Sequence, residues 1–273
     1  TGKTDGGSVG VLRPSAAAGA SFRADPIVVA TVLTLVNAVY VLFVAVQFSY
    51  LFGAWSEGLP DGFTYAEYAR SGFFELVAVS VINFGLLAGA LAFGGRGGSA
   101  ALHRANRTLL YLLTGCTGMM LYSAFSRLML YEEAYGYTYI RFLAHAFMLF
   151  LAVLLVIAGL KIAVPRIPLS KCCIVCGLVA YTAVNYAGMD AFIAAKNIER
   201  YYATGKIDEA YLLRLSPDAV PQLVRFSEEA YPALRPALAD KRRAWSEDKR
   251  AWPSFSWSRY RAMRALESLA AEP

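Results

Sequence analysis

The chain has 273 residues, of which 57% are hydrophobic and 17% are charged, and its formal net charge is +6. A soluble domain of this size could not bury so much apolar surface in one core, so lipid has to cover part of it. The composition therefore excludes an ordinary soluble globular protein and predicts an integral membrane protein.

The chain opens with a Gly/Ala/Ser-rich stretch that has no hydrophobic periodicity. Such a composition is typical of a linker, so we expect residues 1–25 to be a flexible linker at a truncated start. On this interpretation the chain is the C-terminal part of a longer protein, and further membrane helices precede residue 1.

Five long apolar runs follow, each close to the roughly 20 residues that a spanning helix needs. They are residues 27–50, 73–93, 109–130, 140–162 and 172–193. Backbone polar groups in hydrocarbon must be satisfied within the structure, and no run alternates with the period of 2 expected of a membrane barrel strand. The predicted fold class is therefore all-α: a polytopic transmembrane helical bundle over residues 26–193, with the lipid bilayer as its first partner.

Basic residues gather on one side of the membrane when the five spans alternate in direction. That side carries Lys3, Arg13, Arg23, Arg96, Arg104, Arg107, Lys161, Arg166 and Lys171. The other side carries Arg70, Arg127 and Arg141 with Glu57, Asp61, Glu67, Glu75, Glu132 and Glu133. The basic side is predicted to be cytoplasmic, which places residues 194–273 outside a bacterial cytoplasmic membrane.

Residues 194–273 are predicted to form a helical extramembrane region. Ser216, Pro217 and Asp218 make a helix start signal, and the expected helices are residues 207–215, 216–226, 232–250 and 257–269. Acidic and basic residues are mixed and nearly balanced here, so no nucleic-acid partner is expected. The aromatic residues near Trp257 suit either the bilayer interface or packing among these helices.

Polar residues recur near the outer ends of the predicted spans. They form a candidate cluster of Glu67, Arg70, Glu75, Arg127, Arg141, His145, Asn185 and Asp190. A charge in a span is costly unless it faces the bundle interior, a water-filled cavity or another charge, so Glu75 and Asp190 are expected opposite Arg127 and Arg141. The alternative is that these side chains snorkel to headgroups or form structural ion pairs. His145 is either the best candidate for a proton-linked role or a packing residue.

Cys172, Cys173 and Cys176 begin the fifth run, and Cys116 lies in the third. No fourth zinc ligand lies near them, so they are interpreted as small apolar packing residues. Motifs of metallohydrolases, serine hydrolases, kinases and phosphate-binding loops are absent from the sequence. We therefore predict no catalytic residue, metal or cofactor.

Several segments resemble one known family. Residues 50–53 (Tyr-Leu-Phe-Gly), 64–76 (Thr-Tyr-Ala-Glu-Tyr-Ala-Arg-Ser-Gly-Phe-Phe-Glu-Leu), 123–127 (Ser-Ala-Phe-Ser-Arg), 130–136 (Leu-Tyr-Glu-Glu-Ala-Tyr-Gly) and 215–221 (Leu-Ser-Pro-Asp-Ala-Val-Pro) carry the resemblance. They are similar to a bacterial polytopic membrane family, domain of unknown function 4173. The resemblance implies a longer hydrophobic amino-terminal half, and it brings no established activity, substrate or catalytic residue.

Three functional hypotheses remain. The first is a cell-envelope binding, sensing or scaffold protein, whose partners would include other envelope proteins and the preceding N-terminal helices. The second is a solute or proton-coupled transporter or channel that uses the polar cluster, although no proline-broken helix pair or inverted repeat marks a midplane site. The third is an envelope enzyme acting on lipid or glycan, with Glu67 and Glu75 as an acid/base pair.

Overall fold

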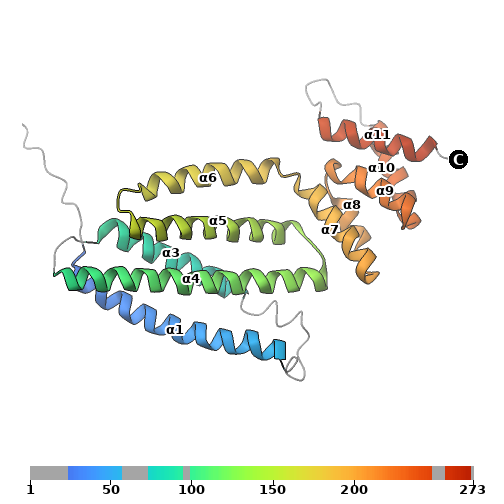
Figure 1. Ribbon diagram of the computed structural model, residues 1–273. Coiled ribbons are helices and arrows are strands. Elements are labelled where there is room, and N and C mark those ends of the chain that lie inside the picture. Colours follow the sequence, from blue (N-terminus) through green and yellow to red (C-terminus); the bar gives the residue numbers. More distant parts are fainter. Residues whose placement is uncertain (1–23, 57–72, 95–98, 248–255, 272–273) are drawn as a thin grey trace, which may run out of the picture.

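The computed structural model describes residues 24–56, 73–94, 99–247 and 256–271. The described residues form helices joined by short connections (Figure 1), with an isolated bridge between Ala24 and Gly94. The expected linker lies almost wholly outside these residues, as do Glu67 and Arg70 of the candidate cluster.

Five of the helices are long and apolar enough to cross a membrane. They are α1 (Pro26–Ser56), α3 (Phe73–Phe93), α4 (Ala100–Tyr135), α5 (Tyr139–Ala163) and α6 (Leu169–Tyr186). We call these five helices the bundle. The protein is an integral, multi-pass membrane protein, and the predicted all-α fold class is confirmed.

Helix α4 is the centre of the bundle, because α1, α3 and α5 all pack against it. Its 36 residues span about 54 Å, so it extends beyond the run 109–130 at both ends. Small residues let α4 and α5 approach closely: a Cβ at Gly118 would meet Leu155 at 3.7 Å, and one at Gly159 would meet Thr114 at 3.7 Å. Helix α6, in contrast, packs mainly against α5.

A buried amide joins α1 to α4. Asn37 is 2% exposed, and its Nδ2 donates to the carbonyls of Leu33 at 2.8 Å and Leu109 at 3.0 Å. One bond satisfies the donor within its own helix and the other crosses to α4, as expected of polar groups that hold membrane helices together. At the same end of the bundle, Asn106 donates to the carbonyl of Pro26 at 3.0 Å.

The fifth apolar run is not one helix. Helix α6 ends at Tyr186, and α7 (Met189–Thr204) begins after Gly188, whose φ of 59° lies in the left-handed region. Glycine adopts that conformation without strain, so it ends α6 and turns the chain. The predicted span 172–193 is thereby corrected to Leu169–Tyr186, and Asp190 belongs to the first turn of α7.

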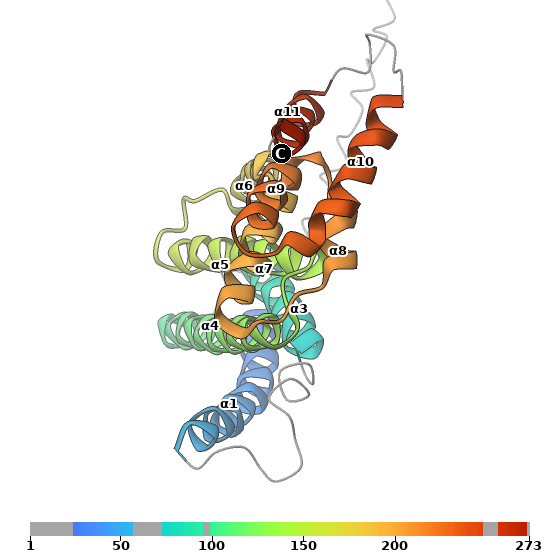
Figure 2. The ribbon, with the colours of Figure 1, turned by 90° about the vertical axis from the view of Figure 1, so that its right-hand side faces the viewer.

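The helices that follow the bundle pack around a core of their own (Figure 2). We call them the C-terminal module; they are α7, α8 (Glu209–Arg214), η1 (Pro217–Ala219), α9 (Val220–Glu229), η2 (Pro232–Leu234), α10 (Arg235–Glu247) and α11 (Trp257–Ala271). Leu223 and Leu238 are fully buried in this core. The start signal at Ser216 opens η1, and α9 follows it directly.

Buried aromatic and polar contacts fix the interior of the module. Phe226 stacks on Tyr231 with ring centroids 5.6 Å apart, and Tyr201 meets Phe226 edge-on at 5.2 Å. Lys241 donates to the carbonyls of Leu213 at 2.9 Å and Leu215 at 3.3 Å, at the C-terminal end of α8. Burial lowers the pKa of the Lys241 ammonium, since desolvation disfavours its charged form.

The Tyr231 hydroxyl donates to the Glu209 carboxylate, and this bond raises the pKa of the phenol above its usual value. The folded protein therefore keeps a proton that the unfolded chain releases. The stabilisation is complete below about pH 10 and is lost as pH rises through the folded pKa. We expect the thermal midpoint of the module, followed in detergent, to fall less steeply with rising alkaline pH in Tyr231→Phe than in the wild type.

The lowered pKa of Lys241 makes its contribution to stability change with pH in the direction opposite to that of Tyr231. The difference between the wild type and Tyr231→Phe isolates the contribution of Tyr231. Tyr202→Phe is the matched control, because Tyr202 is 58% exposed on the surface of the module. Tyr202→Phe should retain the wild-type slope of thermal midpoint against pH. Equal slopes for the wild type and Tyr231→Phe would show that the Tyr231 proton does not contribute to stability.

Candidate functional site

The turn between α4 and α5 is the point at which the bundle meets the C-terminal module. Gly136 ends α4 with a φ of 84°, and its N–H donates to the carbonyl of Glu132 at 2.7 Å. A Cβ at this position would lie 2.7 Å from Oδ1 of Asn197. Both the left-handed backbone and the close approach of α7 therefore require glycine here.

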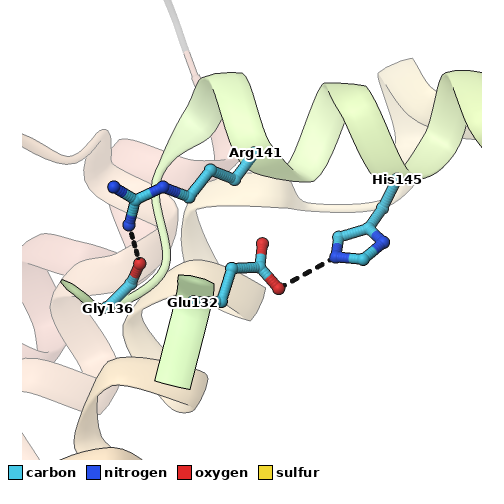
Figure 3. A network of polar contacts seen from close by, with 4 residues as sticks. All are labelled: Glu132, Gly136, Arg141 and His145. Atoms are coloured by element: carbon cyan, nitrogen blue, oxygen red, sulfur yellow. Dashed lines mark hydrogen bonds and ion pairs between the residues drawn. The ribbon is translucent and has the colours of Figure 1, made fainter. Parts of the chain in front are cut away.

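Arg141, one of the predicted site residues, closes this turn from the first residues of α5 (Figure 3). Its Nη1 donates to the carbonyl of Gly136. The guanidinium also lies over the ring of Tyr131, 4.2 Å from the ring centroid, which is cation–π geometry. Arg141 thus satisfies a carbonyl that the end of α4 leaves without a helical partner.

Glu132 and His145 form the main side-chain pair of the site (Figure 3), and Nε2 of His145 lies 2.9 Å from Oε2 of Glu132. Glu132 is 3% exposed. The imidazole meets Phe125 edge-on at 4.6 Å, and its buried Nδ1 has no hydrogen-bond partner among the described residues. The pair can hold or exchange one proton, which is the chemistry this arrangement offers.

The other predicted residues do not converge on this pair. Arg127 is buried in α4 at 7% exposure, whereas Glu75 is exposed at the start of α3 and has no ion pair among the described residues. Asn185 is exposed on α6 and donates to the carbonyl of Tyr181 at 2.7 Å. Asp190 accepts from the N–H of Ser216 at 3.2 Å within the module. Of the six candidates among the described residues, Arg141 and His145 are the two whose contacts lie at the end of α4.

Arg200, on α7, is a site residue that sequence reasoning missed. Its Nε donates to the carbonyl of Glu133 at 2.8 Å and its Nη2 to that of Ala134 at 2.7 Å. Nη1 donates to the carbonyl of Lys206 at 3.3 Å. The planar guanidinium thereby caps the last turn of α4, where carbonyls lack helical partners and the helix dipole favours a cation.

Asn197, three residues before Arg200, was also missed. Its Oδ1 accepts from the N–H of Tyr137 at 3.0 Å, and its Nδ2 donates to the carbonyl of Tyr137 at 2.8 Å. Nδ2 also donates to the carbonyl of Ile193 at 2.9 Å. A single side chain, 9% exposed, therefore satisfies both backbone groups of the central turn residue.

The first turn of α5 is held from the module as well. The hydroxyl of Tyr211, on α8, accepts from the N–H of Tyr139 at 2.9 Å, one of the donors that a helix start leaves without a partner. Burial raises the pKa of the Tyr211 phenol. Phe142 and Phe192 meet edge-on at 5.5 Å on the apolar side of the same contact.

Taken together, the side chains contributed by the module, Asn197, Arg200 and Tyr211, bind backbone groups of the α4–α5 turn. They fix the position of the module on the bundle. We call this set of contacts the junction. The Glu132–His145 pair lies on the bundle side of the junction, where a change of its charge would act on the same turn.

Residues 10–226 match the family model described as Domain of unknown function (DUF4153). The match covers most of the chain. The chain belongs to this family. A family without an assigned function was expected, and that class is confirmed, whereas the specific family 4173 is not. No curated protein and no solved structure matches the chain.

We expect Arg200→Gln to loosen the junction, because it removes the charged donors from the end of α4. Hydrogen bonds from a charged group are worth about 1.5–3 kcal/mol each. Loss of one such bond should speed amide hydrogen exchange at Tyr137 and Tyr139 roughly ten- to hundredfold in the full chain. Arg200→Lys keeps the charge without the fork of donors and should give an intermediate rate.

The matched control is Arg214→Gln, at the exposed end of α8. It should leave exchange at Tyr137 and Tyr139 at the wild-type rate. If Arg200→Gln and Arg214→Gln give the same exchange rates, the junction does not depend on Arg200.

Proposed function

We propose that the protein is a binding or scaffold protein of the cell envelope. In this proposal the bundle anchors the C-terminal module at the membrane surface, and the module recognises another envelope protein. The observation that carries the proposal is the junction, where Asn197 and Arg200 bind backbone groups of the turn between α4 and α5. A module held by this many directed bonds keeps a fixed orientation, which a recognition surface needs.

The pairing of the polar residues supports the same proposal. A solute pathway needs several polar groups around one cavity, whereas here Arg141 caps a backbone carbonyl and Asp190 binds the N–H of Ser216. Asn185 and Glu75 are exposed on separate helices. Mutually paired or outward-facing groups favour a structural role over transport.

A groove on the module offers a surface for the partner. It lies between α7 and α9, has a volume of about 420 Å³, and has apolar walls that include Ile198 and Phe226. Glu199, Arg225 and Glu229 add charges of both signs. An amphipathic segment of a partner protein, with apolar side chains between charged ones, fits this chemistry.

The distribution of basic residues supports placing the module on the outer side of a bacterial cytoplasmic membrane. Arg104 and Arg107 begin α4, and Lys161, Arg166 and Lys171 surround the connection from α5 to α6. All five lie at the bundle end opposite the junction. Positive charge is retained on the cytoplasmic side, so this proposal makes residues 194–273 an external region.

Sidedness is tested by an impermeant thiol reagent on intact cells carrying Ser246→Cys. Ser246 is exposed on α10, and the native cysteines all lie in the spanning helices. Labelling of intact cells is expected if the module is external. Labelling that requires lysis would place the module in the cytoplasm and reverse the assigned orientation.

A proton-coupled transporter is the second candidate, favoured by the Glu132–His145 pair. A carboxylate that is 3% exposed beside an imidazole is a common arrangement for proton transfer in membrane proteins. On this alternative the pair would gain and release a proton during each transport cycle, and Glu132→Gln would abolish transport.

One experiment with two measurements separates these functions. A photoreactive amino acid at Glu229 should give a discrete protein adduct in living cells. Arg225→Glu, which reverses a charge in the same groove, should abolish the adduct, and Arg243→Glu on α10 should leave it intact. In the second measurement, proteoliposomes of the wild-type chain should show no more proton flux than empty liposomes.

Two results would contradict the scaffold proposal. An adduct that survives Arg225→Glu would show that the groove does not select its partner. Proton flux that is present in the wild type and lost in Glu132→Gln would make transport the function instead.

A further inference from the structure

Helix α11 exposes an aromatic pair. Trp257 is 62% exposed and Tyr260 is 44% exposed, and their rings stack with centroids 5.5 Å apart. Burying large aromatic side chains releases much free energy, so an exposed pair of this kind calls for a covering surface.

The pair lies on the helix face opposite the core of the module. Ala262 and Leu266 are fully or almost fully buried and fix the inner face of α11. Trp257, Tyr260 and Arg264 follow at spacings of three and four residues, so they share the outer face. All three side chains remain exposed on the described part of the module.

The position of α11 points to the bilayer as the covering surface. Figure 1 shows α11 beginning at about the level, along the bundle, at which α4 ends and α5 begins. Figure 2, viewed from the module, shows α11 beyond α6, at the edge of the bundle outline. Toward its C-terminal end, helix α6 exposes Leu178, Tyr181 and Tyr186 to the surroundings of the bundle. Lipid that covers this face of α6 would lie next to the first turn of α11.

The chemistry of the outer face fits lipid headgroups. Trp and Tyr are enriched where membrane meets water, because their rings are apolar and their N–H or O–H groups remain hydrated. Arg264 is exposed beside them, and its guanidinium lies 5.9 Å from the centroid of the Tyr260 ring. Arg261 is also exposed, and it pairs with Asp218 of the module at 3.3 Å. Glu267 is the only acidic residue of α11. The excess of positive charge complements anionic phospholipids.

We propose that Trp257, Tyr260 and Arg264 form an interfacial anchor that docks the module onto the anionic headgroup region of the bilayer beside α6. The rings insert among the headgroups, and Arg264 binds lipid phosphate. The module is then held at two places, the junction and the anchor, and the groove between α7 and α9 keeps a fixed angle to the membrane.

The test uses fluorescence of Trp257 in the full chain, with the other tryptophans, Trp55, Trp245 and Trp252, replaced by phenylalanine. The protein is reconstituted in nanodiscs that contain phosphatidylglycerol, with acyl chains either brominated near the headgroup or unbrominated. We expect brominated lipid to quench Trp257 and aqueous iodide to quench it little. If the triple replacement fails to fold, the quenching of Trp257 is obtained instead as the difference in fluorescence quenching between the wild type and Trp257→Phe.

The matched control retains Trp245 alone. Trp245 is half-buried within the module, with Lys241 over its ring at 5.2 Å and Arg259 at 5.5 Å. Brominated lipid should not quench it. Arg264→Gln should reduce the dependence of Trp257 quenching on phosphatidylglycerol, whereas Arg243→Gln on α10 should not.

Two outcomes would overturn the proposal. Quenching of Trp257 by iodide and not by brominated lipid would show that the pair faces water. Quenching by neither would show that protein covers it, as in an association of two copies through α11.

Discussion

The arrangement of this protein depends on how the end of α4 is satisfied. A helix end leaves carbonyls without partners, and here the turn lies where bundle and module meet. Arg200 supplies donors to two of these carbonyls, and Arg141 supplies one to the carbonyl of Gly136. Because these donors come from α7 and α5, the same bonds that complete α4 also fix the module on the bundle.

Hydropathy predicts the spanning helices because a bilayer restricts a chain to apolar segments that satisfy their own backbone. Helix α3 occupies residues 73–93, the predicted run. Hydropathy does not detect a change of chain direction inside an apolar stretch. The run 172–193 stays apolar across Gly188, and only the left-handed backbone of that glycine separates α6 from α7. Asp190 was consequently assigned to a span that does not contain it.

The site was harder to predict than the fold because its bonds join side chains to backbone. Sequence patterns pair charges with opposite charges, so they do not indicate that Arg200 binds backbone carbonyls as a helix cap. Glu132 was assigned to the outer surface because its run was expected to end at residue 130. One signal could have identified it: Leu121, Leu128 and Glu132 continue a buried stripe at helical spacing, and all three are buried. Asn197 follows buried Ile193 by four residues in the same way.

The junction also limits how the module and the bundle can influence each other. A ligand shifts an equilibrium only as far as it binds one arrangement better than another, so a partner on the module affects the bundle only by favouring a different junction. The α4–α5 turn is the element both sides contact: Asn197 binds its backbone from the module, and Arg141 closes it from the bundle. The carbonyl of Glu132 accepts from the N–H of Gly136, while its carboxylate pairs with His145. A partner on the module and a change of charge at this pair would both act on this one turn, and any coupling between them would be reciprocal.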